Sequence, residues 1–117
     1  MNGNGIAPLA GTTGTIEIVI EATINTDAKM AQRKVTGWVV SEVANMMGGG
    51  QPKLVINKRA FWRVPVVLTS STRGVVGQVG SVDVDAETGE LSVDEALKEH
   101  MLNNAKALVS SAPDATR

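Results

Sequence analysis

The sequence predicts an α+β domain, with a four-stranded antiparallel sheet and two helices packed on one face, in the order strand, helix, three strands, helix. Three observations support this fold class. Valine accounts for 16 of the 117 residues, against one Phe, two Trp and no Tyr, and β-branched side chains favour sheet. Two segments repeat apolar residues at helical spacing, and the others alternate as strands do. The links between the last strands are short, which favours antiparallel neighbours.

The N-terminal 24 residues divide into two parts. Residues 1–14 contain four Gly, one Pro and two Asn, and this composition offers too little apolar surface to offset the entropy of ordering. We therefore expect residues 1–14 to form a flexible N-terminal end. In residues 15–24, apolar side chains occupy every second position from Ile16 to Ile24. This is the period of a strand with one buried face, so the first strand is expected here.

A helix is expected over residues 27–47. Asn25, Thr26 and Asp27 provide side-chain oxygens that can cap its N-terminus, and three consecutive glycines at 48–50 are expected to end it. One face is apolar, with residues at three- and four-residue steps: Ala28, Ala31, Val35, Trp38, Val39, Val43 and Met46.

Two strands are predicted at residues 53–58 and 59–69, with a tight connection near Asn57 or Lys58, and a third at 75–85. In the second, Trp62 shares a face with Ala60, Val64 and Val66 and is predicted to point into the core, whereas Phe61, Arg63, Pro65, Val67 and Thr69 share the other face.

The last part of the fold is a second helix. The spacing of Ser92, Val93, Asp94 and Glu95 is that of a capping box, and an apolar stripe follows that ends near Val109. We expect one domain over residues 15–109 and a frayed C-terminal tail over 110–117.

Several classes of activity lack the residues they require. There is no cysteine and one histidine, so cysteine zinc sites, thiol nucleophiles and sites with two imidazoles are excluded. None of the serines lies in a GxSxG elbow. No apolar run is long enough to span a membrane. We expect a cytoplasmic protein that is not an enzyme and uses no cofactor.

Charge is unevenly distributed although the net charge is −1. Residues 29–73 carry eight basic residues against one carboxylate, and the flanking segments are acidic. A nucleic-acid-binding protein is therefore an alternative, provided that the basic residues form one surface. They are Lys29, Arg33, Lys34, Lys53, Lys58, Arg59, Arg63 and Arg73.

From about residue 28 to residue 91, an expected helix is followed by Trp62 in a strand, Gly74 in a turn and a closing Val-Asp-Ala-x-Thr-Gly-Glu run at residues 84–90. This pattern resembles the PepSY-type domains. It implies a similar arrangement of helix and strands. PepSY-type domains are thought to restrain peptidases, so a peptidase-regulating domain is a second alternative.

Three further features of the sequence are candidate sites. Asp83, Asp85, Glu87 and Glu90 could hold a cation, but their spacing is not that of an EF-hand, and a solvated turn is the favoured interpretation. The glycines at 74, 77 and 80 lack the pattern and lysine of a phosphate loop, and indicate a bulged strand. His100 borders the apolar stripe of the second helix and is expected to be structural.

The function favoured by the sequence is association with another protein or with a second copy of the chain, as a homo-oligomer. If the helices cover only the face that holds Trp62, the other face presents apolar and basic side chains together, and such a surface usually binds a partner. The expected partner-binding residues are Arg59, Phe61, Arg63, Val67 and Arg73.

Overall fold

The structure is a computed structural model that describes residues 13–111. The expected flexible ends at 1–14 and 110–117 lie largely outside the described residues. The elements follow the order α1 (Ala28–Glu42), β1 (Met47–Gly49), β2 (Lys53–Asn57), β3 (Arg59–Ser70), β4 (Gly74–Asp85), β5 (Leu91–Ser92) and α2 (Glu95–Ser111). The predicted α+β class is confirmed, with five strands in one antiparallel sheet in place of the predicted four.

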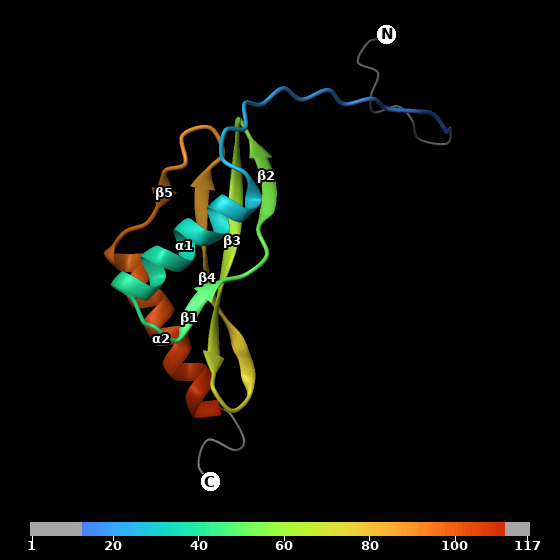
Figure 1. Cartoon of the computed structure of the whole chain (residues 1–117). Coiled ribbons are helices and arrows are strands. Elements are labelled where there is room, and N and C mark those ends of the chain that lie inside the picture. The colour runs from blue at the N-terminus through green and yellow to red at the C-terminus, as the bar shows by residue number, and fades with distance from the viewer. Residues whose placement is uncertain (1–12, 112–117) are drawn as a thin grey trace.

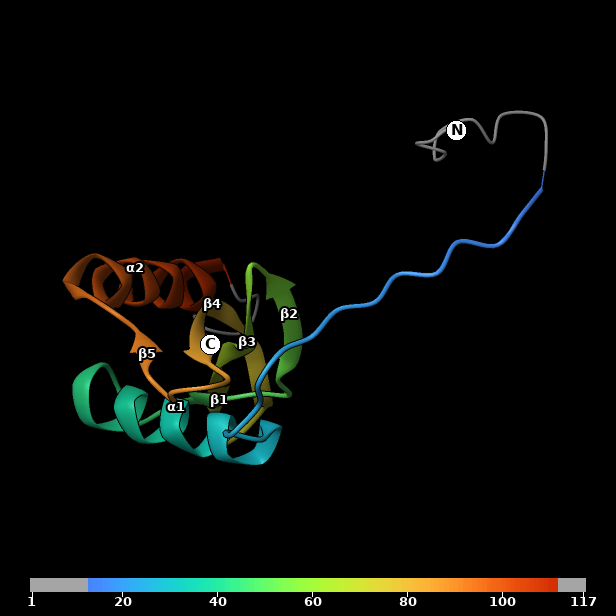
Figure 2. The same cartoon turned by 90° about the horizontal axis from the view of Figure 1, so that it is seen from above.

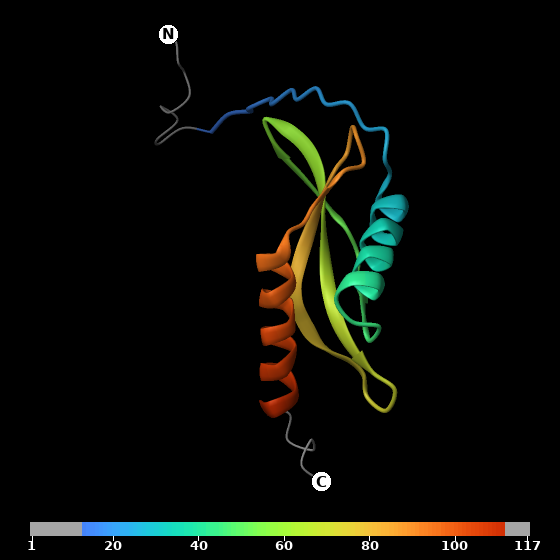
Figure 3. The same ribbon diagram turned by 90° about the vertical axis from the view of Figure 1, so that its left-hand side faces the viewer.

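The long hairpin of β3 and β4 forms the centre of the sheet. One edge of β3 pairs with both β2 and β1, while β4 pairs with β5 through two residues. As predicted, both helices lie on the same side of the sheet. They lie side by side and are separated from each other (Figures 2 and 3). We call this side the inner face and the opposite side the outer face.

The core lies between the inner face and the helices. It is built mainly from aliphatic side chains, as the composition predicts, and α1 contributes Ala31, Val35 and Val39 at helical spacing. Trp62 packs against this cluster, and its Nε1 donates a hydrogen bond to the carbonyl oxygen of Thr26 at 2.6 Å. The predicted inward orientation of Trp62 is therefore confirmed.

The predicted strand at residues 15–24 is wrong. None of these residues is assigned to a strand, and the extended chain leaves the sheet at one end and projects away from it (Figure 1). The chain joins the domain at Asn25 and Thr26, whose backbone N–H groups both donate to the carbonyl oxygen of Ala86. Alternation correctly indicated an extended chain but not a pairing partner.

The first helix is shorter than predicted. It begins as expected, because Asp27 caps it by accepting a hydrogen bond from the Met30 N–H at 2.8 Å, but it ends at Glu42 rather than at residue 47. Gly48 and Gly49 belong to β1 instead of ending the helix. A Cβ atom at Gly49 would lie 3.0 Å from Val64 Cγ1 and 3.1 Å from the backbone oxygen of Gln32, so glycine allows β1 to pass under the helix.

The second helix has a different cap from the one predicted. Ser92 lies in β5, and Asp94 Oδ1 accepts a hydrogen bond from the Leu97 N–H at 2.8 Å. The capping-box spacing at Ser92 therefore located the helix correctly but placed its N-terminus two residues early. A strand residue cannot also serve as N-cap here, because β5 pairs Ser92 with Asp83.

The glycines of β4 have the structural role that was predicted. The register between β3 and β4 shifts twice, between Val66 and Val67 and between Leu68 and Thr69. A Cβ at Gly77 would lie 3.0 Å from Leu108, and one at Gly80 would lie 3.1 Å from Met101. Bulges and glycines together let α2 pack closely on β4.

Candidate functional site

The outer face of β2, β3 and β4 is the candidate site. Antiparallel register places side chains of paired residues on the same face, and β3 pairs Phe61 with Val55 and Asp85, Arg63 with Lys53 and Asp83, and Val67 with Gln78. Of the five predicted partner-binding residues, four therefore lie on this face: Arg59, Phe61, Arg63 and Val67. The fifth, Arg73, lies in the turn at the far end of the hairpin.

Charged side chains on this face form pairs across the strands. Arg63 Nε lies 2.9 Å from Asp83 Oδ1, and its guanidinium carbon lies 5.4 Å from the centre of the Phe61 ring. The hydrogen bond and charge of Asp83 hold the pKa of Arg63 above its usual value. Arg63 thus presents a planar surface between a carboxylate and an aromatic ring, which is the environment in which arginine often contacts proteins.

A second pair orders the end of the sheet from which residues 15–24 leave. Arg59 forms an ion pair with Asp85, and Asp85 Oδ1 also accepts hydrogen bonds from the N–H groups of Glu87 and Thr88 at 2.8 and 3.0 Å. The Thr88 N–H is the largest reason that the pKa of Asp85 is lowered, with smaller contributions from Glu87 and Arg59 that outweigh partial desolvation. The carboxylate is therefore a turn cap as well as an ion-pair partner.

The protein should lose stability in acid partly through Asp85. Because the folded pKa lies below the ordinary carboxyl value of 3.8, the stabilisation is present above that value and is lost as the pH falls below it and through the folded pKa. Asp85→Asn keeps an oxygen for the two N–H groups but removes the charge. Its thermal midpoint should fall less over this range than that of the parent, whereas Glu99→Gln, on the exposed side of α2, should follow the parent. Identical slopes for the parent and Asp85→Asn would contradict the role of the charge.

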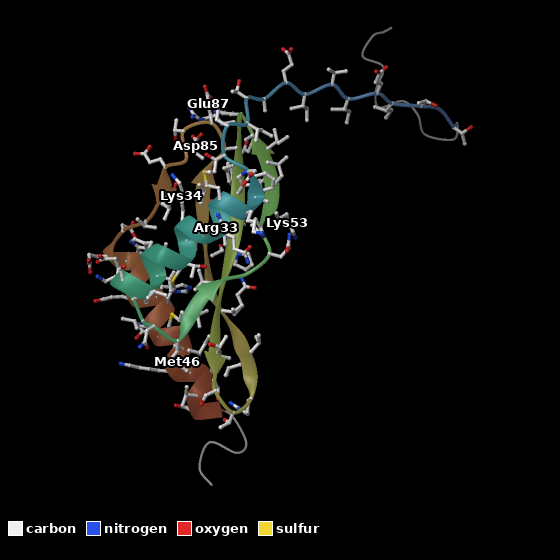
Figure 4. All side chains as sticks on the ribbon, viewed as in Figure 1. Arg33, Lys34, Met46, Lys53, Asp85 and Glu87 are labelled. Atoms are coloured by element: carbon white, nitrogen blue, oxygen red, sulfur yellow. The ribbon has the colours of Figure 1, made fainter. Side chains whose placement is uncertain are left out.

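The acidic run does not gather as a cation site. Asp83 and Asp85 are each paired with an arginine, and the described residues contain no group of three His, Cys, Asp or Glu side chains that could hold a metal ion. Asp85 and Glu87 lie near the point where residues 15–24 leave the sheet (Figure 4). Asp83 and Asp85 lie in β4, and Glu87 lies in the turn that follows it.

The basic residues of the central segment are divided between two sides of the molecule. Arg59 and Arg63 lie on the outer face beside carboxylates, whereas Lys29, Arg33 and Lys34 belong to α1, on the inner side. The Nζ of Lys34 donates a hydrogen bond to the carbonyl oxygen of Gly89 at 2.9 Å. The single basic surface that nucleic-acid binding requires is therefore not formed by these five residues.

His100 interacts within its own helix. Its Nε2 lies 3.0 Å from Nδ2 of Asn104, which also donates to the carbonyl oxygen of Val79 at 2.8 Å. No carboxylate from another element is hydrogen-bonded to it in the described structure. His100 thus helps to orient the amide that connects α2 to β4.

A groove beside the departing chain was not foreseen from the sequence. It has a volume of about 990 Å³ and lies between residues 20–23 and the connection from β2 to β3. Its walls include Ile20, Ala22, Ile56 and Ala60. The only sequence feature that points to this groove is the alternation of apolar residues in 15–24, which by itself predicts a strand of the same sheet.

Comparisons with known proteins add no relative to this description. No family model, curated protein or solved structure matches the chain. The resemblance to PepSY-type domains therefore stays a prediction. Among the described residues, no helix is long and apolar enough to cross a membrane.

Proposed function

We propose that the protein is a non-enzymatic association module that binds a second copy of itself, or another protein, through the outer face of the sheet. The observation that carries the proposal is the placement of both helices on the inner face, which leaves no described helix or strand over the outer face (Figures 2 and 3). Apolar and charged side chains are mixed there, in the manner of association surfaces that also exist free in solution.

The arrangement of charge on the outer face suits self-association. Arg59 and Arg63 alternate with Phe61 along β3, and the neighbouring strand provides Asp83 and Asp85. A two-fold axis would bring the same surface of a second copy against this one, so that each arginine meets carboxylates and each apolar residue meets another. Exposed ion pairs contribute little on their own. Exchanging them between copies therefore costs little, while burying Phe61 and its apolar neighbours drives association.

The two alternatives differ in what supports them. The PepSY-like role, restraint of a peptidase, is one form of protein association and would use the same kind of surface. Nucleic-acid binding requires one basic surface, and the distribution of the lysines and arginines does not favour it.

Self-association is tested by light scattering and sedimentation at micromolar concentration. We expect the parent chain to be a dimer or larger, and Val67→Lys to shift it toward monomer, because a buried unpaired ammonium at the centre of the face would oppose contact. Val40→Lys, a matched change at an exposed position of α1, should leave the oligomer intact. Circular dichroism would verify that both variants fold. A strictly monomeric parent, or equal behaviour of the two variants, would overturn self-association through this face.

A further inference from the structure

Residues 15–24 combine three properties that are rarely found together in a monomer. They are extended, they are unpaired in the described structure, and their large apolar side chains face solvent. Ile16, Ile18 and Ile20 are 63%, 76% and 57% exposed. Figure 4 shows side chains alternating on the two sides of this segment, with no element packed against either side. We call residues 15–24 the arm.

The arm is held firmly where it joins the domain. Two backbone hydrogen bonds connect Asn25 and Thr26 to Ala86, the Asn25 amide donates to the Glu87 carbonyl oxygen at 3.1 Å, and Trp62 donates to the Thr26 carbonyl oxygen. The direction in which the arm leaves is therefore set by the folded domain. At about 3.3 Å per residue, ten extended residues reach about 33 Å, which is long enough to contact another molecule.

The sheet has an edge that matches the arm. β2 pairs with β3 on one side, and no described strand pairs with its other side. An edge of this kind presents backbone donors and acceptors to any added strand. The inner-face side chains of β2, Leu54 and Ile56, remain 39% and 42% exposed. They lie beyond the strands that α1 mainly contacts, which are β1, β3 and β4.

The two faces of the arm complement the two faces of β2. A strand added to this edge in a register that aligns its isoleucines with the inner face would continue the apolar surface of Leu54 and Ile56. The same register turns Glu17 and Glu21 to the outer face, where β2 presents Lys53. Once the isoleucines are aligned with the inner face, apolar side chains meet apolar ones and acidic side chains meet a basic one.

From this match we propose that the arm of one copy adds as an extra strand to the free edge of β2 in a second copy. The proposal is independent of the outer face, because it uses a different element and a different edge. The groove between the arm and the β2–β3 connection, lined by Ile20, Ala22, Ile56 and Ala60, reaches only the last residues of β2, so an added strand would meet it at that end of the edge.

Pairing of the arm with its own β2 is disfavoured by the geometry. The arm is anchored beside Ala86, just after β4, and the free edge of β2 lies on the far side of β3 and β2 from there. Residues 20–23 already pass the connection from β2 to β3, so pairing with the same chain's β2 would require the arm to reverse its direction, whereas it continues past the end of the sheet (Figures 1 and 3). A second copy can receive the arm without any such reversal.

Cross-linking between two chains that carry cysteines at different positions tests whether the arm binds a second copy. The chain contains no cysteine, so only the introduced cysteines can react. Chains carrying Glu17→Cys or Glu21→Cys would be mixed with chains carrying Lys53→Cys and treated with a short bismaleimide, which spans neighbouring positions. Lys106→Cys, on the exposed side of α2, replaces Lys53→Cys as the matched control. We expect a cross-linked dimer with Lys53→Cys and little with Lys106→Cys.

Variants of the arm complete the test without affecting the folded domain. Ile18→Lys in the Glu17→Cys chain should lower the cross-linked fraction by roughly ten-fold or more, whereas Ile18→Val should retain it. The cross-link should also persist when both chains carry Val67→Lys, which separates this proposal from association through the outer face. If the mixture gives no more dimer than the Lys106→Cys control, or if a Glu17→Cys/Lys53→Cys chain links only within itself, arm exchange is refuted.

Discussion

Replacing Gly49 with alanine should lower the free energy of unfolding by about 1–3 kcal/mol, the usual cost of forcing an extra carbon into a packed interior. The added Cβ would lie 3.0 Å from Val64 Cγ1, 3.1 Å from the Gln32 backbone oxygen and 3.2 Å from Thr36 Oγ1. Two of these neighbours belong to α1 and one to β3. Relief would therefore require the helix to move away from the sheet, which would also weaken the 3.0 Å hydrogen bond from the Gly49 N–H to Thr36 Oγ1.

The neighbouring glycine provides the control for this experiment. At Gly48 an added Cβ would meet only Thr36 Cγ2, at 3.9 Å, which is ordinary contact. Neither glycine has a positive φ, so the backbone at both positions can accept alanine. The Gly48→Ala variant should therefore be slightly more stable than the parent, because alanine restricts the unfolded chain. Urea unfolding of both variants would measure the difference. Equal stability of Gly48→Ala and Gly49→Ala would show that the approach of α1 to β1 is not as close as described.

Local patterns predicted the features that depend on neighbouring residues. The alternation in β3 correctly separated Trp62 and Val64 from Phe61 and Arg63, because successive side chains of a strand must point to opposite faces. Helical spacing likewise identified Ala31 and Val35 as core residues. These predictions needed no knowledge of what lies opposite each element.

The predictions that failed concern partners that are distant in sequence. Residues 15–24 have the pattern of a half-buried strand, but pairing depends on whether an edge lies within reach of the chain. The glycines at 48 and 49 are compatible both with a helix end and with a strand beneath a helix, and pairing with Val66 and Val67 of β3 selects the strand. In the same way, Ser92 suits a helix cap until β5 pairs it with Asp83. Each of these choices is made by tertiary contact rather than by local preference.

The candidate site shows the same division. The alternation of side chains along a strand was enough to place four residues of β3 on one face: Arg59, Phe61, Arg63 and Val67. The ion pairs that define the chemistry of this face, however, join residues 20 and 26 positions apart. Their formation depends on the register of the β3–β4 hairpin, and two bulges shift that register farther along. Bulges of this kind cannot be positioned from the valine pattern alone.

The second large effect is expected at Met101, where alanine should lower the free energy of unfolding by about 2–5 kcal/mol. Met101 is the one fully buried side chain of α2 among residues 95–110. It packs against Gly80, where the backbone carries no side chain. Among the strands, α2 mainly contacts β4. Removing this side chain therefore leaves a cavity at the main contact of the helix, where neighbouring glycine has no side chain to fill it.

A pair of variants distinguishes lost packing from general damage to the helix. Met101→Leu nearly conserves volume and should cost less than about 1.5 kcal/mol, while Met101→Ala improves helix propensity and yet should be far less stable. Hydrogen exchange would localise the effect, since weak docking should expose the amides of α2 before those of the β3–β4 hairpin. If Met101→Ala were as stable as Met101→Leu, the attachment of α2 would have to rest on its half-buried residues, Leu97, Leu102 and Leu108, rather than on the contact with Gly80.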